Sequence, residues 1–318
     1  MTVRAWPFSR STQLRLGWIT FLALAVTLPG CDGPHAKPQI VYGQYGLFDG
    51  EFVKPRAAAY NPATDRIYIV DFAARIQVFD SEGHYVGPTW TTPDYRNGRP
   101  SGLSIARDGN LLVSDSHYHC LRFYRPDGTE IVERKIGGEA GTEPGQFGYI
   151  SDAVQDEEGS FYVAEFGENQ RISKLAPDGH FLCAWGSAGQ KPGQFARVRA
   201  LTIGPDGNLY VADACNHRIQ VFSRDGSLVA CWGEEGTEPG QLAYPYDVAF
   251  NSKGELYVVE YGNHRVQKFT KAGKSLGCWC GPGGEPGQLH SPWALVIDGK
   301  DRVHVIDSEN HRVQRFGF

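Results

Sequence analysis

The sequence has no excess of basic residues and no apolar segment long enough to cross a membrane. Its 318 residues include 31 lysines and arginines against 36 aspartates and glutamates. Without residues 1–30, which hold three arginines and no acid, 28 basic and 36 acidic side chains remain, a net charge of −8. Nucleic-acid binding needs a basic surface, so this balance argues against such a partner. The apolar run from Gly17 to Thr27 is too short to span a bilayer.

Motifs for metal or haem binding are also missing. No Cys-x-x-Cys-His sequence for haem attachment occurs, and no spacing is typical of a closed zinc site. His117 and His119 are close in sequence, but two imidazoles without a third ligand make a weak metal site, and we interpret them as part of an exposed loop. Six cysteines follow Cys31 and are open to disulfide pairing or to remaining free thiols: Cys120, Cys183, Cys215, Cys231, Cys278 and Cys280.

What the chain does contain is a repeat of about 47 residues. Six copies are recognisable, the last three clearest: Tyr68–Phe79, Leu112–Tyr124, Tyr162–Leu175, Tyr210–Phe222, Tyr257–Phe269 and His304–Phe316. Equivalent apolar residues are spaced by 45, 51, 47, 47 and 47 positions: Ile76, Leu121, Ile172, Ile219, Val266 and Val313. A strand-rich repeat of this length is typical of a propeller or another array.

Each repeat predicts four short strands. In the fifth copy they are separated by glycine-containing turns: Pro245–Phe250, Glu255–Glu260, Arg265–Phe269 and Ser275–Trp279. Such a unit cannot bury both sheet faces alone and stacks on its neighbours in a ring. The last repeat stops at Phe316 without a fourth strand, whereas Pro38–Tyr45 is an isolated strand. We therefore predict an all-β, six-bladed β-propeller of four-stranded blades over residues 38–318, with the N-terminal strand closing the last blade.

These residues resemble the NHL-repeat family. Its pattern combines a Pro-containing strand start, Tyr-Val-Ala-Asp, Asn-His-Arg followed by Ile or Val, and a strand ending in Phe, and copies four to six follow it closely. The first copy lacks Asn-His, the second has Cys120 where Arg is expected, and the third has an extra residue in Glu165–Arg171. The resemblance covers about residues 38 to 318. It implies the propeller fold, which hosts many activities.

The N-terminus is typical of an exported lipoprotein. Basic residues precede the short apolar run, and Leu28–Cys31 resembles a bacterial lipobox, in which the cysteine becomes the acylated first residue. We expect residues 1–30 to be a signal peptide, Cys31 to be the lipidation site and residues 31–37 to be a tether. This predicts a lipid-anchored protein on the periplasmic side of the bacterial cell envelope. The alternatives are ordinary secretory cleavage nearby and an uncleaved anchor.

Histidines, acids and tryptophans recur at equivalent places in the last repeats: His217, His264, His311, Asp213, Glu260, Asp307, Trp185, Trp232 and Trp279. Successive blades set equivalent histidines far apart, so they do not share a metal ion. We expect the histidines and acids to tie loop to strand within each blade, because buried polar groups in turns need partners. The tryptophans are predicted to pack between blades.

The residues that open the first strand of each repeat are predicted to ring one mouth of the central channel. Two arginines, two aspartates, a tyrosine and a tryptophan make this ring a candidate ligand site: Arg56, Asp152, Arg199, Tyr246, Asp247 and Trp293. Because side chains alternate along a strand, some of the six could lean between blades instead. The irregular segment Gly87–Gly98, which carries Trp90, Tyr95 and Arg96, is predicted to be an exposed loop for partner contact or a lid.

Two classes of function fit this reading. A rigid propeller face can bind a protein, peptide or small molecule, and no catalytic group stands out. NHL-like propellers also include the peptidyl-hydroxyglycine amidating lyase, with zinc on channel histidines, and six-bladed lactonases hold calcium, so zinc or calcium is implied if the protein is an enzyme. The six ring residues contain no histidine, and Asp152 and Asp247 do not complete a calcium shell. We predict a monomeric, membrane-anchored, extracytoplasmic binding module without a cofactor, and a metal-dependent channel enzyme as the alternative.

Overall fold

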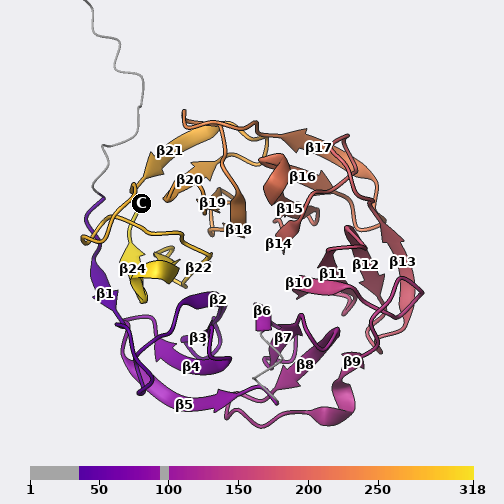
Figure 1. Ribbon diagram of the computed structural model, residues 1–318, viewed down its shortest axis with the longest axis horizontal. Coiled ribbons are helices and arrows are strands. Elements are labelled where there is room, and N and C mark those ends of the chain that lie inside the picture. The colour runs from indigo at the N-terminus through magenta and orange to yellow at the C-terminus, as the bar shows by residue number, and fades with distance from the viewer. Residues whose placement is uncertain (1–35, 94–99) are drawn as a thin grey trace, which may run out of the picture.

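Six antiparallel sheets of four strands each surround a central channel (Figure 1). The computed structural model describes residues 36–93 and 100–318. The predicted all-β, six-bladed propeller is confirmed. The predicted signal peptide, Cys31, and Tyr95 and Arg96 lie outside the described residues. No helix within the described residues is long and apolar enough to cross a membrane.

The blades follow one another along the chain, and each runs from the channel outward. Blade 1 is β2 (Pro55–Asn61), β3 (Arg66–Asp71), β4 (Arg75–Asp80) and β5 (Tyr85–Thr91). Blade 2 is β6 (Pro100–Ile105), β7 (Leu111–Asp115), β8 (Cys120–Tyr124) and β9 (Ile136–Gly137). Blade 3 is β10 (Tyr149–Gln155), β11 (Phe161–Phe166), β12 (Arg171–Leu175) and β13 (Phe181–Trp185). Blade 4 is β14 (Val198–Ile203), β15 (Leu209–Asp213), β16 (Arg218–Phe222) and β17 (Leu228–Trp232). Blade 5 is β18 (Pro245–Phe250), β19 (Leu256–Glu260), β20 (Arg265–Phe269) and β21 (Ser275–Trp279).

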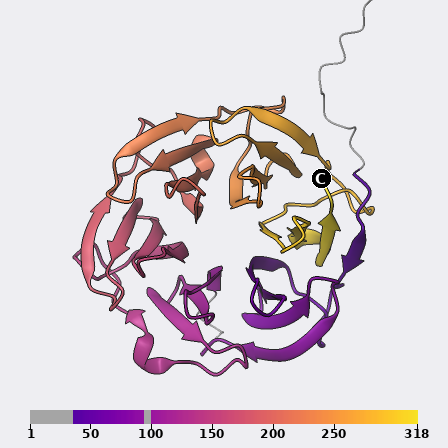
Figure 2. The same ribbon diagram turned by 180° about the vertical axis from the view of Figure 1, so that it is seen from behind.

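The sixth blade combines both ends of the propeller. Its inner strands are β22 (Ala294–Ile297), β23 (Val303–Asp307) and β24 (Arg312–Phe316), and its outer strand is β1 (Ile40–Tyr42). The β1 strand pairs antiparallel with β24, with Ile40 opposite Arg315 and Tyr42 opposite Val313. From behind, indigo β1 lies beside the yellow last blade (Figure 2). The predicted closure is therefore correct, and it completes the fourth strand of the last blade with a strand from the start of the propeller.

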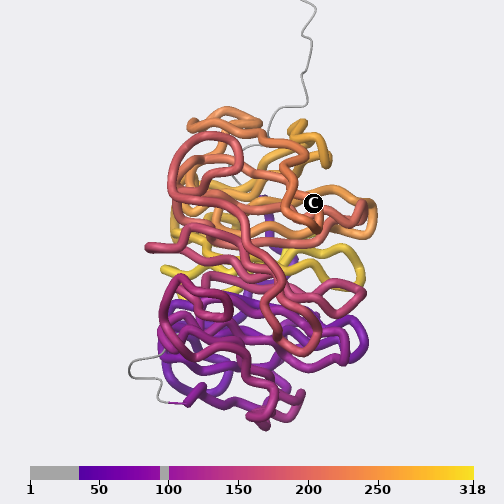
Figure 3. Tube along the Cα trace, turned by 90° about the vertical axis from the view of Figure 1, so that its right-hand side faces the viewer, coloured from indigo at the N-terminus to yellow at the C-terminus, as the bar shows by residue number. Residues whose placement is uncertain are grey.

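The core lies between blades, because each sheet covers the face of the next. One cluster joins Val70 of blade 1 to Val113 of blade 2, and another joins Val221 of blade 4 to Val258 of blade 5. The recurring tryptophans pack as predicted: Trp185 contacts Phe222 of the next blade, with ring centroids 6.2 Å apart. Trp232 likewise contacts Phe269 at 5.0 Å. In edge view the stacked blades form a thick disc (Figure 3).

Trp90 belongs to the same series and corrects one expectation. It lies in β5 and packs between Tyr68 of its own blade and Tyr124 of blade 2, with centroids 6.3 and 5.9 Å away. It is therefore an inter-blade tryptophan and not part of an exposed loop. Three other repeats also have a tryptophan on the outer strand, which would have predicted this position for Trp90. The divergent sequence around Trp90 obscured the correspondence.

The recurring acids tie loop to strand within a blade, as predicted. In blade 4, Asp213 accepts hydrogen bonds from the Ala196 backbone N–H and from the side chains of Asn216, Arg218 and Gln220, at 2.8, 2.8, 2.8 and 3.0 Å. Glu260 and Asp307 are bonded in the same way. These acids are fully buried, so the bonds compensate the removal of charge from water.

The recurring histidines act between blades, which differs from the expectation that they act within one. The imidazole Nδ1 of His264 accepts a hydrogen bond from the Ser291 backbone N–H of blade 6 at 2.8 Å. His311 accepts from Lys54 of blade 1 at 3.0 Å, closing the same link across the ring closure. Ring closure brings these partners together, and the sequence of one repeat does not show them.

The described cysteines are mostly free thiols. Five are unpaired: Cys120, Cys183, Cys215, Cys231 and Cys280. The free-thiol alternative is therefore correct for these five positions.

Candidate ligand site at the channel mouth

The central channel contains a cavity of about 500 Å³, lined by the first strand of every blade. All six residues predicted to ring the mouth line this cavity: Arg56, Asp152, Arg199, Tyr246, Asp247 and Trp293. At the other end the cavity reaches Pro62, Ser252 and Asp301. The sequence therefore placed these residues in one cavity. That they bind a ligand stays a prediction.

A β-bulge near the start of five of the six inner strands, all except β22, explains why neighbouring residues share the cavity. The pairing with the second strand skips one residue, between Val198 and Ala200 in β14 and between Pro245 and Asp247 in β18. The skipped residues are Arg199 and Tyr246. A bulge adds a residue and re-aims side chains, so strict alternation no longer applies. Tyr246 and Asp247 therefore both line the channel, although they are adjacent in sequence.

Arginine and aromatic side chains from blades 1, 4, 5 and 6 stack across the mouth. The Arg199 guanidinium lies over the rings of Tyr246 and Trp293, 4.6 and 4.9 Å from their centroids. The Arg56 guanidinium also lies over Trp293, at 4.6 Å. Trp293 thus contacts two cations through its ring, an arrangement that holds both guanidinium groups by cation–π attraction.

Two aromatic residues that sequence reasoning missed complete this wall. Tyr261 stacks on Tyr246 with centroids 4.5 Å apart, and Phe72 lies 5.4 Å from the Arg56 guanidinium. Both directly follow the recurring acid of the second strand. The available signal in the sequence was a large aromatic residue at this repeat position, where most other copies have a small residue.

The mouth is asymmetric, because blades 2 and 3 contribute small side chains. Ser101 and Ser151 occupy the places equivalent to Arg199, and their hydroxyls donate to the backbone carbonyls of Ile150 and Ala164, at 2.6 and 3.3 Å. At Gly102 an added Cβ would lie 2.8 Å from the Cα of Asp152, so only glycine allows these two strands to approach so closely. The large side chains therefore face an open half of the mouth.

The two aspartates link neighbouring inner strands from inside the channel. Asp152 Oδ2 accepts from the Leu201 backbone N–H of blade 4 at 3.2 Å. Asp247 Oδ2 accepts from the Leu295 N–H of blade 6 at 3.0 Å, and its Oδ1 accepts from Val248 at 2.8 Å. Both carboxyl groups are thus already engaged with backbone and hold the inner strands together.

Burial sets the charge state of the channel. It raises the pKa of Asp247 to about 7. Burial and then the neighbouring Asp247 raise the pKa of Asp152 well above its usual value. Burial lowers the pKa of Arg199, which is 6% exposed, yet a guanidinium stays protonated at neutral pH. At pH 7 the arginines therefore keep their charges, while the Asp247 carboxyl is partly neutral.

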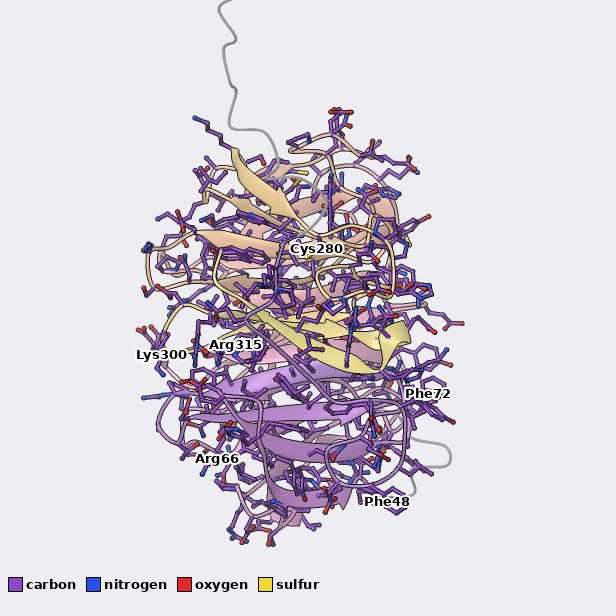
Figure 4. The ribbon with its side chains drawn as sticks, turned by 90° about the vertical axis from the view of Figure 1, so that its left-hand side faces the viewer. Phe48, Arg66, Phe72, Cys280, Lys300 and Arg315 are labelled. Atoms are coloured by element: carbon purple, nitrogen blue, oxygen red, sulfur yellow. The ribbon has the colours of Figure 1, made fainter. Side chains whose placement is uncertain are left out.

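The mouth opens on the face that carries the Asn-His-Arg loops. Figure 4 shows Phe48 and Phe72 on this side of the disc and Arg66 and Lys300 on the opposite side. Exposed aromatic side chains lie on this face, beside the loop histidines or on neighbouring loops, and form what we call the aromatic rim: Tyr45, Phe48, Phe72, Tyr149 and Tyr244. His117 and His119 are part of this rim, where both rings contact Tyr149 at 6.1 and 5.6 Å.

The donor set of the cavity does not fit a zinc site built on histidines. The lining residues include aspartates and no histidine. Within residues 36–93 and 100–318, no group of three or more His, Cys, Asp or Glu side chains is placed to hold a metal ion.

Comparison with known proteins identifies the repeats. The NHL repeat profile matches residues 195–222, 242–269 and 289–316, which are the last three copies. The chain therefore contains NHL repeats arranged in a six-bladed β-propeller.

Two curated relatives come from Xenopus laevis. Peptidyl-glycine alpha-amidating monooxygenase A is 39% identical over 90 residues, which cover 27% of this chain and 10% of that protein. The B form is 36% identical over 89 residues, with the same coverage of 27% and 10%. The chain thus matches about a tenth of the length of these relatives.

Solved structures share the fold at low sequence identity. A proposed gluconolactonase has a TM-score of 0.63 and 16% identity, covering 90% of this chain and 97% of that one. Virginiamycin B lyase from Staphylococcus aureus has a TM-score of 0.61 and 13% identity, covering 88% and 99%. At these identities the likeness shows the fold alone.

Proposed function

We propose that the protein is a lipid-anchored, extracytoplasmic binding module whose ligand site is the mouth of the propeller channel. The observation that carries this proposal is the asymmetric wall of Arg56, Arg199, Tyr246 and Trp293 over a cavity of about 500 Å³. A cavity of this size accommodates a small molecule or the end of a peptide chain. The exposed aromatic rim adds area for the rest of a larger partner.

The wall is held in place before any ligand arrives. Bulges in β14 and β18 fix the backbone beneath Arg199 and Tyr246, and Tyr261 supports Tyr246 from the side. Asp247 bonds the backbone of the adjacent blade and so fixes the spacing of two inner strands. A preorganised site loses little conformational entropy on binding, which favours affinity.

A metal-dependent channel enzyme is the alternative. The short match to the amidating monooxygenases and the fold shared with a proposed gluconolactonase favour this alternative. The cavity lining favours binding, because its aspartates are engaged with backbone N–H groups and its histidine content does not match a zinc-binding channel.

The test is ¹⁹F NMR of protein labelled with 5-fluorotryptophan, with the Trp293 signal assigned by Trp293→Phe. The probes are a library of short peptides and of small acids, amines and neutral compounds. We expect at least one compound to shift the Trp293 signal while the signals of Trp185 and Trp232, on outer strands, stay unchanged. Shifts confined to the outer tryptophans, or no shift with any compound, would contradict a ligand site at the mouth.

A further inference from the structure

Arg199 differs from the other buried arginines of the protein. It is 6% exposed, its Nε has no hydrogen-bond partner, and no described carboxylate forms an ion pair with it. The ring faces of Tyr246 and Trp293 lie against its guanidinium. A buried charged group with an unpaired donor is costly, so this arrangement requires an explanation.

Arg218, in the same blade, shows what a structural arginine looks like here. It is 8% exposed, pairs with Asp213 at 2.8 Å and donates to the carbonyl oxygens of Gln190, Lys191 and Gln194, at 2.6, 2.9 and 2.7 Å. Arg265 and Arg312 repeat this pattern in blades 5 and 6. These three arginines each pair with an acid of their own blade and bond backbone carbonyls, whereas Arg199 has no such ion pair among the described residues.

The nearby acids do not take the place of a partner for Arg199. Asp152 and Asp247 direct their carboxyl oxygens to the N–H groups of Leu201, Val248 and Leu295. Within the described residues, no salt bridge joins Asp152 or Asp247 to the Arg199 guanidinium. The Arg199 guanidinium is therefore a cation inside the channel whose N–H donors are not bonded to either aspartate.

The geometry around Arg199 selects the type of ligand. The rings of Tyr246 and Trp293 lie against the guanidinium, whereas its N–H groups point outward in its own plane. A carboxylate accepts two parallel hydrogen bonds from such a fork. A carboxylate also carries one charge, which suits a channel that contains two carboxyl groups better than a doubly charged phosphate would.

We propose that Arg199 is the receptor for a carboxylate group, and that an apolar or aromatic part of the same ligand packs on Tyr246 and Trp293. This inference rests on the proposed ligand site and specifies its chemistry. The carboxylate belongs either to a small organic acid or to the free C-terminus of a peptide. Both sources present the same group to Arg199, and experiment separates them.

Isothermal titration calorimetry tests the inference with matched probes. Benzoate and benzamide share the ring and differ in charge, phenylphosphonate carries a second charge, and a tripeptide ending in phenylalanine is compared with its C-terminal amide. We expect the free carboxylates to bind at least about tenfold more tightly than their amides, since a charge-assisted pair is lost in the amide. If the tripeptide binds more tightly than benzoate, the site is assigned to peptide C-termini. If benzoate binds more tightly than the tripeptide, the site is assigned to small organic acids.

Arg199→Gln is expected to remove this preference, whereas Arg197→Gln is the matched control. Arg197 is exposed and does not line the cavity, so its replacement changes net charge equally and alters only the electrostatic field around Arg199 and Tyr246. Loss of carboxylate binding in both variants would point to general electrostatic attraction and overturn the assignment. Equal binding of benzoate to wild type and Arg199→Gln, or tighter binding of phenylphosphonate, would also overturn it.

Stability provides a readout that does not depend on choosing the right ligand. Arg199→Met removes a buried cation without an ion pair and loses only its two cation–π contacts, so the melting temperature is expected to stay close to that of wild type. A fall as large as that caused by Arg218→Met would show that the Arg199 guanidinium has a hydrogen-bonded structural partner and would refute the inference. If Trp293 responds in the NMR experiment to neutral compounds but not to carboxylates, the carboxylate assignment fails while the ligand site stands. If Trp293 responds to nothing, the proposed site itself fails.

Discussion

Replacing Arg218 by methionine is expected to destabilise the propeller by about 3–5 kcal/mol, the usual cost of breaking a buried ion pair from one side. The variant loses the Nε bond to Asp213 and the bonds to three backbone carbonyls of residues 190–194. Methionine keeps much of the side-chain volume, so packing changes little. The main cost comes from Asp213, which is 0% exposed and loses its cation.

Thermal unfolding and a double-mutant cycle measure this cost. For a chain of this size, about 3–5 kcal/mol corresponds to a fall in Tm of roughly 5–9 °C. Asp213→Asn leaves Arg218 its carbonyl acceptors and is expected to cost less, about 1–3 kcal/mol. The two losses should fall short of additive by at least about 1 kcal/mol, because the residues are in direct contact. Additive losses, or a Tm of Arg218→Met within about 2 °C of wild type, would refute the reasoning.

The difference between Arg218→Met and wild type should also depend on pH. Burial raises the pKa of Asp213, and Arg218 opposes that rise. Without Arg218 the folded-state pKa of Asp213 moves further above its unfolded value. Such a carboxyl binds protons preferentially in the folded state, so its penalty is present at neutral pH and shrinks as pH falls. Urea unfolding at about pH 8 and about pH 5 should show a smaller gap at the lower pH, and a gap that widens would contradict this account.

Three further outcomes are expected. Benzoate should bind more tightly as pH falls through about 7, because protonation of Asp247 removes a negative charge that faces the anion. The other charged groups that face the anion are Asp152, Arg56 and Arg199. Asp247→Asn should flatten this pH dependence, and an affinity that rises with pH would contradict the explanation. Cys31→Ser should release the protein from membranes, whereas Cys215→Ser, at an exposed free thiol, should not; membrane fractionation that persists in Cys31→Ser would contradict lipidation. Elemental mass spectrometry of residues 32–318, exported and purified without chelator, should find no stoichiometric metal, and near-stoichiometric zinc or calcium would favour the enzyme alternative.

The architecture was predictable because it depends on spacing. Apolar residues that recur at intervals near 47 determine where strands fall, and the missing fourth strand after Phe316 implied a partner near Ile40. The inner-strand openings were predictable for the same reason. Repeats place equivalent residues at equivalent distances from the channel, so Arg56, Arg199 and Trp293 had to meet at one mouth.

The details of the site were not predictable, because they depend on neighbours from other blades. The His264 imidazole bonds the backbone of the next blade, and a single repeat contains no trace of that partner. Strict strand alternation argued against Tyr246 and Asp247 sharing the channel, and a bulge removed that conflict. Arg199 lacks an ion pair because the two nearby acids, Asp152 and Asp247, accept hydrogen bonds from backbone N–H groups of other blades instead. The sequence alone does not show these bonds.

The closing strand also determines how the ring would respond to mechanical tension. Residues 36–39 lead directly into β1, whose hydrogen bonds to β24 run across the direction of the strand. A pull on this end of the chain loads those bonds together in shear, and the load passes into the outer edge of blade 6. Arg199 and Tyr246 lie on inner strands of blades 4 and 5. The channel mouth can therefore hold its shape while the outer edge of the last blade carries the force.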